Sequence, residues 1–459
     1  MSGKVFNRLL SPLPAYLNPM RKESFKNYMM KVKMSSAAPT QDYATITDLK
    51  ATIAREMGVD TGYQPIPKDR SHLLKYLPQT QEELPTRSMQ DSFLAGIIPL
   101  STDKVLQDKY ITFLGHVRTG RLLEDMDIFA VMVAHKHIVN PKAPKNEDFP
   151  YTLVTALVDK IDFSEFTPKP QEDIKISGHV SWVGKSSLEV VVWLEQQMHN
   201  TWHRITRALF LLAARDSNNM KAAIVNAIDP ANDREREILS GGEDRKKRRI
   251  KIQQAHVSKV VPNSEEQKVI HDLYLRTANK DISLRTRVLP SGCAWMSAAH
   301  ISNVVFSHPS DRNMHNTVFG GFIMRQAEEL SWVLGHMFSK YRPILKSISD
   351  ISFQRPIAVS SLIQMHAYVV YTQMNYMQIA VFVETFNPIT GKNDTTNTFQ
   401  FTFVVPEVVN EIVPNTYHEA MMYIDGRRHF QDVMKKSIDT GKIVSDGSTG
   451  DSYTSDLGT

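Results

Sequence analysis

The chain has 459 residues, a formal charge of +5, 42% hydrophobic residues and 22% charged residues, which is the composition of an ordinary globular protein with two or more domains. Its single cysteine, Cys293, excludes an intramolecular disulfide and a zinc site built from several cysteines. No apolar run reaches the roughly 20 residues of a membrane-spanning helix, so we expect neither a membrane span nor, at this modest charge, a nucleic-acid partner.

The first segment of the chain, residues 1–36, is basic and contains one acid, Glu23. Its Lys and Arg residues are interspersed with apolar side chains, which is the composition of a mitochondrial presequence. Pro12 and Pro14 would interrupt a presequence helix, and a basic tail without a targeting role is the alternative. The presequence interpretation predicts a protein of the mitochondrial matrix.

Residues 85–216 are predicted to form a first α+β domain. Stretches rich in β-branched and aromatic residues predict strands over 93–100, 110–113, 151–163, 174–182, 188–195 and 201–213. A long apolar segment over 119–134 interrupts them and is predicted to form a core helix. A long apolar helix beside a run of strands on which it can pack is an α+β pattern.

Residues 217–290 break this pattern and are predicted to be a linker with helical segments. A helix over 229–240 would stop at the pair Gly241-Gly242. A second helix, reaching residue 275, would begin with a capping box at Ser264. The basic run over 245–249 could form a nucleic-acid patch, but a short run of this kind more often marks a solvated helix face, which we expect here.

Residues 291–410 are predicted to form a second domain of the same kind. Its core helix is expected over 322–338, and its strands over 301–306, 346–353, 362–371, 377–386 and 398–405. A helix within residues 411–440 would close the fold. Residues 441–459, rich in Gly, Ser, Asp and Thr, would form a disordered tail.

The two apolar helices share a pattern that indicates an internal duplication. Each begins at a glycine and carries an acid seven residues later, Asp127 after Gly120 and Glu328 after Gly321. The two acids lie 201 residues apart, and each is flanked by apolar residues at helical spacing. An isolated acid on a helix is usually an ordinary surface residue. The repetition of the pattern is what favours a functional role.

Four segments resemble the double hotdog acyl-coenzyme A thioesterases, in particular the mitochondrial branch of that family. They are residues 87–92, 122–127, 178–187 and the turn 315–321, with the sequence His-Asn-Thr-Val-Phe-Gly-Gly. The resemblance implies an α+β fold of two tandem hotdog domains, each a long central helix wrapped by an antiparallel sheet. It also implies that the two helices lie side by side under one continuous sheet, with an active site shared between the repeats.

The function implied by this resemblance is hydrolysis of acyl-coenzyme A (acyl-CoA) thioesters to free fatty acid and coenzyme A. A carboxylate at the interface of the two repeats would activate the attacking water. Coenzyme A is part of the substrate, so no separate cofactor is expected, and no metal. The family further implies a homo-oligomer, a trimer of double-hotdog units.

The candidate catalytic residues are Asp127 from the first repeat and Asn316, Gly320 and Gly321 from the second. A carboxylate held among apolar side chains has a raised pKa, which suits a general base at neutral pH. Backbone N–H groups at the start of a helix favour the oxyanion that develops on the thioester carbonyl, and the Asn316 amide could orient the water or the carbonyl. The alternative for Asn316 and the glycines is an ordinary turn and helix cap.

Glu328 would form a second catalytic site with the loop that precedes Gly120. This site departs from the family pattern, because at the repeat offset Thr119 stands in the place of Gly320 and Gly115 in the place of Asn316. One glycine and the side-chain amide are therefore missing. We predict that the second site is weaker or inactive.

Further residues are candidates for binding the substrate, namely Thr317 and Phe319 in the second repeat and Lys185, Ser186 and Ser187 in the first. The family implies that the turn over residues 184–187 holds the phosphates or the pantetheine arm of coenzyme A. A lysine beside small hydroxyls suits a phosphate. A plain hairpin turn is the alternative.

Two other functions are compatible with the sequence. A hotdog dehydratase or hydratase uses a His and an acid near the core helix, and His315 could serve there. A non-catalytic acyl-CoA sensor would bind without hydrolysis. The sequence has no Gly-x-Ser-x-Gly motif, which argues against a serine hydrolase, and His300, His308 and His315 have no recognisable metal-ligand spacing.

Overall fold

The computed structural model describes residues 43–56, 69–144, 147–164, 166–199, 201–254, 259–278, 286–308, 311–313, 317–353, 355–359, 361–387 and 390–445. The chain divides into two compact units, residues 1–43 and 44–459, and every element below belongs to the second unit. The predicted presequence therefore lies outside the described residues. Within the described ranges, no helix is long and apolar enough to cross a membrane.

The first half of the second unit contains one long helix and a run of antiparallel strands. Its elements are α2 (Ile46–Glu56), the 3₁₀ helices η2 (Ser71–Tyr76) and η3 (Gln81–Glu83), α3 (Met89–Ser92), β1 (Leu94–Ile98), α4 (Lys104–Tyr110), α5 (Thr119–His137), β2 (Tyr151–Val158), β3 (Ile161–Phe163), β4 (Ile174–Val183), β5 (Ser187–Met198) and β6 (Thr201–Asp216). The prediction of a strand over 110–113 is wrong. Tyr110 ends α4 instead, where its buried hydroxyl is hydrogen-bonded to the Asp125 carboxylate.

The second half repeats this arrangement after a helical linker. The linker holds α6 (Asp233–Gln254) and α7 (Ser264–Thr277), and the second half holds β7 (Cys293–Trp295), η4 (Met296–Ala298), β8 (His300–Phe306), α8 (Gly320–Ser339), β9 (Ile344–Ile348), β10 (Ile351–Ser352), β11 (Leu362–Gln373), β12 (Tyr376–Asn387), β13 (Lys392–Val404), β14 (Glu411–Val413) and α9 (Tyr417–Ser445). The start of the predicted tail, residues 441–445, continues α9 and is not disordered. Residues 446–459 lie outside the described part.

One sheet joins the two halves. Over the described residues it has twelve strands, with the order β1-β4-β5-β6-β3-β9-β13-β12-β11-β8, and β2 pairs with β6 and β10 beside this path. Where the halves meet, Ile161 pairs with Ile348 and Val158 pairs with Ile351. At an offset of 190 residues Ile161 is equivalent to Ile351 and Val158 to Ile348, so the symmetry of the repeat exchanges the two pairs.

The predicted single strands over 151–163 and 346–353 are each divided into two. The break lies at Asp159 and Lys160 in the first half and at Ser349 and Asp350 in the second. The Lys160 N–H donates to the Asp350 carboxylate across the junction, at 2.6 Å. Because of the break, the two parts of each predicted strand pair with different partners across the junction: β3 pairs with β9, and β2 pairs with β10.

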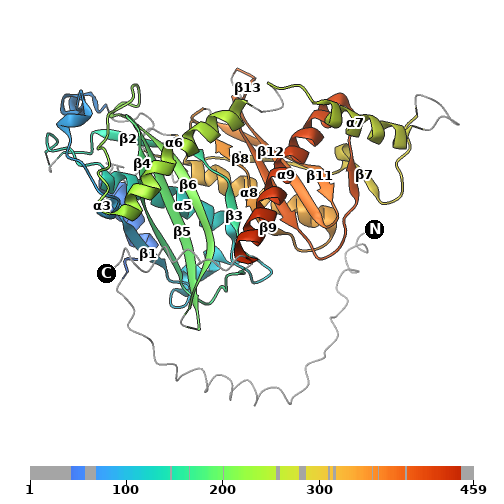
Figure 1. The fold of residues 1–459 in the computed structure, drawn as a ribbon, viewed down its shortest axis with the longest axis horizontal. Helices are drawn as coiled ribbons and strands as arrows, with labels where there is room; N and C mark the ends of the chain where they lie inside the picture. The colour runs from blue at the N-terminus through green and yellow to red at the C-terminus, as the bar shows by residue number, and fades with distance from the viewer. Residues whose placement is uncertain are drawn as a thin grey trace, which may run out of the picture. The chain divides into compact units, whose positions relative to one another are not determined.

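The two long helices, α5 and α8, pack against each other beneath the sheet. A Cβ on Gly120 would lie 3.1 Å from the Arg325 carbonyl oxygen, and one on Gly321 would lie 2.9 Å from the Glu124 Cα. Each helix therefore has a glycine as its second residue, because the other helix passes too close for a side chain. Figure 1 shows α6 and α9 across the opposite face of the sheet from α5 and α8.

The helix α6 corrects two predictions. It continues through Gly241-Gly242, because Gly242 packs against the Trp182 ring, where an added Cβ would lie 2.0 Å from Cδ1. The basic run is also not wholly a solvated face. Arg249 is buried and forms ion pairs with Asp159 and Glu189 on the sheet, so part of the run anchors the linker to the first half.

The cap of α7 differs by one residue from the prediction. Asn263, and not Ser264, is the N-cap, and its side-chain oxygen accepts from the Glu266 N–H at 2.9 Å. The Glu266 carboxylate accepts in return from the Asn263 N–H, also at 2.9 Å. The reciprocal pair satisfies two N–H groups that a helix leaves without intrahelical acceptors.

Candidate active site

The carboxylate of Asp127 lies against the start of the helix of the other repeat. Its Oδ2 accepts a hydrogen bond of 2.7 Å from the Gly321 N–H, and the residue is 1% exposed. The sequence predicts that the acid of the first repeat lies across from the glycine turn of the second repeat, and this position is confirmed. Its catalytic role stays a prediction.

Thr155 completes the surroundings of this acid. Thr155 lies on strand β2, and its hydroxyl donates a hydrogen bond of 2.7 Å to Asp127 Oδ1. The sequence did not point to Thr155, because a threonine in a strand has no distinguishing pattern. Only the packing of α5 on β2 brings it to Asp127.

The electrostatics of Asp127 are those of a base that works near neutral pH. Burial raises the pKa of this carboxyl to about 6, and the nearby Glu124 adds to the increase. The hydrogen bonds from Thr155 and Gly321 oppose it, because they stabilise the charged form. Near pH 7 the group is therefore mostly ionised and still able to accept a proton.

The two glycines of α8 have different surroundings. A Cβ on Gly320 would lie 3.0 Å from the Phe353 ring and 3.5 Å from Asp127 Oδ2. The N–H of Gly321 is engaged by Asp127, which makes it a positioning donor for the acid. The N–H of Gly320, in the first turn of α8, has no acceptor within the helix pattern itself. Of the two predicted oxyanion donors, Gly320 is the one that fits the role.

The turn that precedes these glycines is only partly described. Asn316 and His315 lie outside the described residues. Thr317 donates its N–H to the Asn313 side-chain oxygen at 3.1 Å, and the Phe319 N–H bonds to the Asp311 carbonyl at 3.2 Å. Phe319 is the N-cap residue of α8. These bonds hold the turn beside the start of α8.

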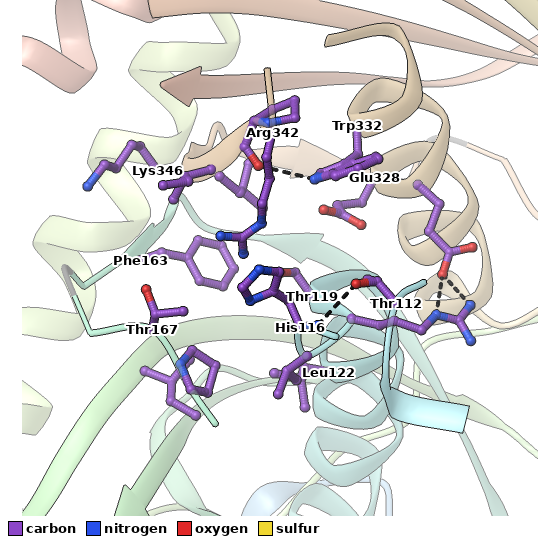
Figure 2. A pocket seen from close by; sticks show the side chains of 18 of the residues that line it. Thr112, His116, Thr119, Leu122, Phe163, Thr167, Glu328, Trp332, Arg342 and Lys346 are labelled. Carbon is purple, nitrogen blue, oxygen red and sulfur yellow. Dashed lines mark hydrogen bonds and ion pairs between the residues drawn. The ribbon is translucent and has the colours of Figure 1, made fainter. Parts of the chain in front are cut away.

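Glu328 occupies the equivalent place in the second repeat. It is 4% exposed and lies against Gly120, where an added Cβ would be 2.9 Å from Glu328 Oε2. Unlike Asp127, it lines a pocket of about 400 Å³, which Figure 2 shows with the Glu328 carboxyl directed inward. Burial, with the neighbouring Glu329, raises the pKa of this carboxyl to about 8.

Ion pairs hold the helices together between the two acids. Glu124 of α5 contacts the Arg325 guanidinium of α8, with 2.8 Å between Oε2 and Nε. Glu329 of α8 accepts from Arg118, which precedes α5, at 3.1 Å from Nε. The charged residues beside each acid are thus paired across the helix crossing.

The predicted coenzyme-binding turn connects β4 and β5. The Gly184 N–H bonds to the Ser187 carbonyl at 2.8 Å, and Lys185 is exposed. Leu212 of β6 pairs with Thr155 on one side and with Leu188 on the other. The turn therefore lies two strands away from Thr155 at the same level of the sheet. Searched over the described residues, no group of His, Cys, Asp and Glu could hold a metal ion.

This arrangement can carry out hydrolysis by activated water. A buried carboxylate can take a proton from water, and N–H groups at a helix start can stabilise an oxyanion. Both parts meet at the crossing of α5 and α8, once in each repeat.

Comparisons with known proteins find thioesterases. Residues 315–391 match the family model of the thioesterase superfamily. The chain is 41% identical over 367 residues to the mitochondrial acyl-coenzyme A thioesterase 9 of Mus musculus, covering 79% of this chain and 83% of that protein. It is 40% identical over 364 residues to the mitochondrial acyl-coenzyme A thioesterase 9 of Homo sapiens, covering 79% and 82% respectively.

Among solved structures, an acyl-CoA hydrolase of Staphylococcus aureus matches with 21% identity and a TM-score of 0.32. The match covers 33% of this chain and 97% of that chain. The predicted fold class, two tandem hotdog repeats, is confirmed by the family match and the sheet described above. By its likeness to the mammalian proteins over most of both lengths, the chain belongs to the double hotdog acyl-coenzyme A thioesterases.

Proposed function

We propose that this chain hydrolyses acyl-CoA thioesters in mitochondria, with Asp127 as the general base of one site between the repeats. The observation that carries the assignment is the buried Asp127 carboxylate, whose two oxygens accept hydrogen bonds from Thr155 and Gly321. The relatives that are named mitochondrial acyl-coenzyme A thioesterases support the substrate class and the location. We place the protein in the matrix on the composition of residues 1–36.

The reaction needs one proton to move twice. Asp127 takes a proton from water while the water oxygen bonds to the thioester carbonyl carbon, and the carbonyl oxygen becomes an oxyanion. The Gly320 N–H stabilises that charge, and one such donor contributes roughly 3 kcal/mol to the transition state. The C–S bond then breaks, and the leaving sulfur takes the proton from Asp127. The products are a carboxylic acid and coenzyme A.

The remaining assignments complete the site around these atoms. Asn316 orients the water or the carbonyl. Thr317 and Phe319 contact the acyl thioester at the start of α8. Lys185, Ser186 and Ser187 hold the phosphates or the pantetheine arm. The position of their turn, two strands from Thr155 at the same level of the sheet, supports this assignment. We also propose a homo-oligomer, a trimer of this 52.2 kDa chain, which light scattering after gel filtration would test.

The deciding experiment measures free coenzyme A with a thiol-reactive dye. Wild type releases it from a panel of acyl-CoA thioesters, whereas Asp127→Asn loses about 10²–10⁴-fold in kcat, the typical contribution of a general base. Asp108→Asn, an exposed acid on α4, is the matched control and keeps the wild-type rate.

Other outcomes would point elsewhere. Binding of acyl-CoA without release of the thiol would indicate a sensor, and a change in enoyl absorbance would indicate a dehydratase. Full activity of Asp127→Asn near pH 7 would reject Asp127 as the base.

A further inference from the structure

The pocket at Glu328 has the parts of a reaction centre. Its acid is buried, lies against Gly120 at the start of α5, and lines about 400 Å³ of space. Aromatic and aliphatic side chains form much of the wall; they include Phe113, Leu122, Phe163, Phe166, Ile205 and Trp332. A mainly apolar wall of this kind suits an acyl chain.

The symmetry of the repeat shows how the two acids differ. At the offset of 190 residues that relates β2 to β9, the position equivalent to Thr155 is Leu345, which lines the Glu328 pocket. Asp127 therefore has a hydroxyl donor in Thr155, whereas the equivalent residue in the Glu328 half is the apolar Leu345. The aromatic neighbour is kept, since Phe353 lies at Gly320 and Phe163 lines the Glu328 pocket.

Charged groups face the Glu328 pocket from three elements. Those that line it are His116 and Arg118 before α5, Glu329 on α8, and Arg342 and Lys346 before and on β9. Glu329 is paired with Arg118. The half-buried Arg342 has no ion-pair partner within the described residues, and Figure 2 shows it pointing into the same space as Glu328. An anionic group of a coenzyme A thioester would neutralise this cation.

We propose that the Glu328 pocket is a second hydrolytic centre for acyl-CoA thioesters. The inference rests on the proposed function, because it assigns the same reaction to the other half of the repeat. The Glu328 site differs from the Asp127 site in its acid, in the absence of a hydroxyl equivalent to that of Thr155, and in the charged residues that line its pocket.

The chemical step is the same and balances without a further reactant. The ionised Glu328 carboxylate takes a proton from water, and the water oxygen bonds to the carbonyl carbon. The C–S bond breaks, and the sulfur takes the proton back from Glu328. Gly120, which has no Cβ, leaves room for the Glu328 carboxylate at the start of α5.

The two acids titrate in different ranges because of these surroundings. Burial raises the pKa of Glu328 to about 8 and that of Asp127 to about 6. At pH 7 roughly one tenth of Glu328 is ionised, against about nine tenths of Asp127. Glu329 raises the pKa of Glu328 further, whereas Arg118 and the Gly120 N–H lower it. The sequence predicts a second site that is weaker or inactive. With these pKa values Glu328 is mostly protonated at pH 7 and mostly ionised at pH 9.

The test follows kcat against pH from 6 to 10 in four enzymes. They are wild type, Asp127→Asn, Glu328→Gln and the double variant. We expect Asp127→Asn to be weak at pH 7 and to gain about tenfold by pH 9, with a midpoint near 8. The double variant loses this rise. Circular dichroism and thermal melts establish that each variant is folded.

A second pair of variants separates a base from a structural acid. In the Asp127→Asn background, Leu345→Thr restores the missing hydroxyl and shifts the midpoint to lower pH by about one unit or more. Leu345→Val has the same shape without the hydroxyl, and leaves the midpoint unchanged. Equal profiles for the Thr and Val variants would overturn the proposal, because Glu328 would then not control the rate.

The outcomes distinguish this inference from the proposed function. If Asp127→Asn is inactive at every pH while wild type is active, the second centre is rejected and the Asp127 assignment stands. If Asp127→Asn keeps the full wild-type rate and Glu328→Gln abolishes it, the Asp127 assignment fails and the Glu328 centre stands. A rise in Asp127→Asn that survives Glu328→Gln would also reject the second centre.

Discussion

The hydroxyl of Thr155 donates a hydrogen bond of 2.7 Å to Asp127 Oδ1, across 28 residues of sequence. A hydrogen bond to the charged form of an acid lowers its pKa, and one to a charged group contributes about 1.5–3 kcal/mol. This bond therefore keeps Asp127 ionised at a pH where its burial alone would protonate it. Thr155 acts on the reaction through Asp127.

Thr155→Val should move the activity of the Asp127 site to higher pH. Loss of the donor raises the pKa of Asp127 by about one to two units, so kcat near pH 6 falls while kcat at high pH is largely kept. A pH–rate series measures the shift. Thr396→Val, which removes another buried hydroxyl bonded to a carbonyl, is the control and keeps the wild-type midpoint. An unchanged midpoint in Thr155→Val would contradict the role of the hydroxyl.

The Asp127 site should lose activity on the acid side of neutrality. The base form is the ionised one, so kcat increases as the pH rises through the pKa of about 6 and falls roughly tenfold for each unit below it. The measurement uses Glu328→Gln, in which only one of the two acids can titrate. A flat profile from pH 5 to 7 would show that another group sets the rate.

Gly321→Ala should damage both packing and activity. The added Cβ would lie 2.9 Å from the Asp127 Cβ and from the Glu124 Cα, so α5 and α8 must move apart. Overpacking of this kind costs about 1–3 kcal/mol of unfolding free energy. Denaturant unfolding and kcat measure the two effects. Gly241→Ala on α6 is the comparison, because its Cβ meets only the flexible end of Arg245, and it should keep both values.

Arg249→Met should destabilise the attachment of the linker helix. Arg249 is buried between Asp159 and Glu189, and removing one partner of a buried ion pair costs about 3–5 kcal/mol. We expect the lower end of this range, because Arg248 and Arg245 still contact the two acids. Lys247→Met, on the exposed part of the same run, should change stability by less than about 0.5 kcal/mol. Equal losses in both variants would exclude the anchoring role.

The sequence indicated the duplicated helices and their acids because these features are local. Apolar periodicity, a glycine at the helix start and an acid seven residues later can all be recognised in one segment, and the second copy confirms the pattern in the first. The turn signals were less reliable. Gly241-Gly242 has the pattern of a helix stop, but its role depends on Trp182, which lies on a strand of the first domain.

The sequence by itself determined the two repeats, their α+β content and the acid–glycine spacing, since each depends on neighbours within a few turns of chain. The tertiary structure decided which groups surround each acid. Thr155 reaches Asp127, and Leu345 takes the equivalent place at Glu328, only because strand pairing across the junction fixes the register of β2 and β9. That register depends on contacts between residues about 190 positions apart in the sequence. The difference between the two carboxylates depends on the same contacts.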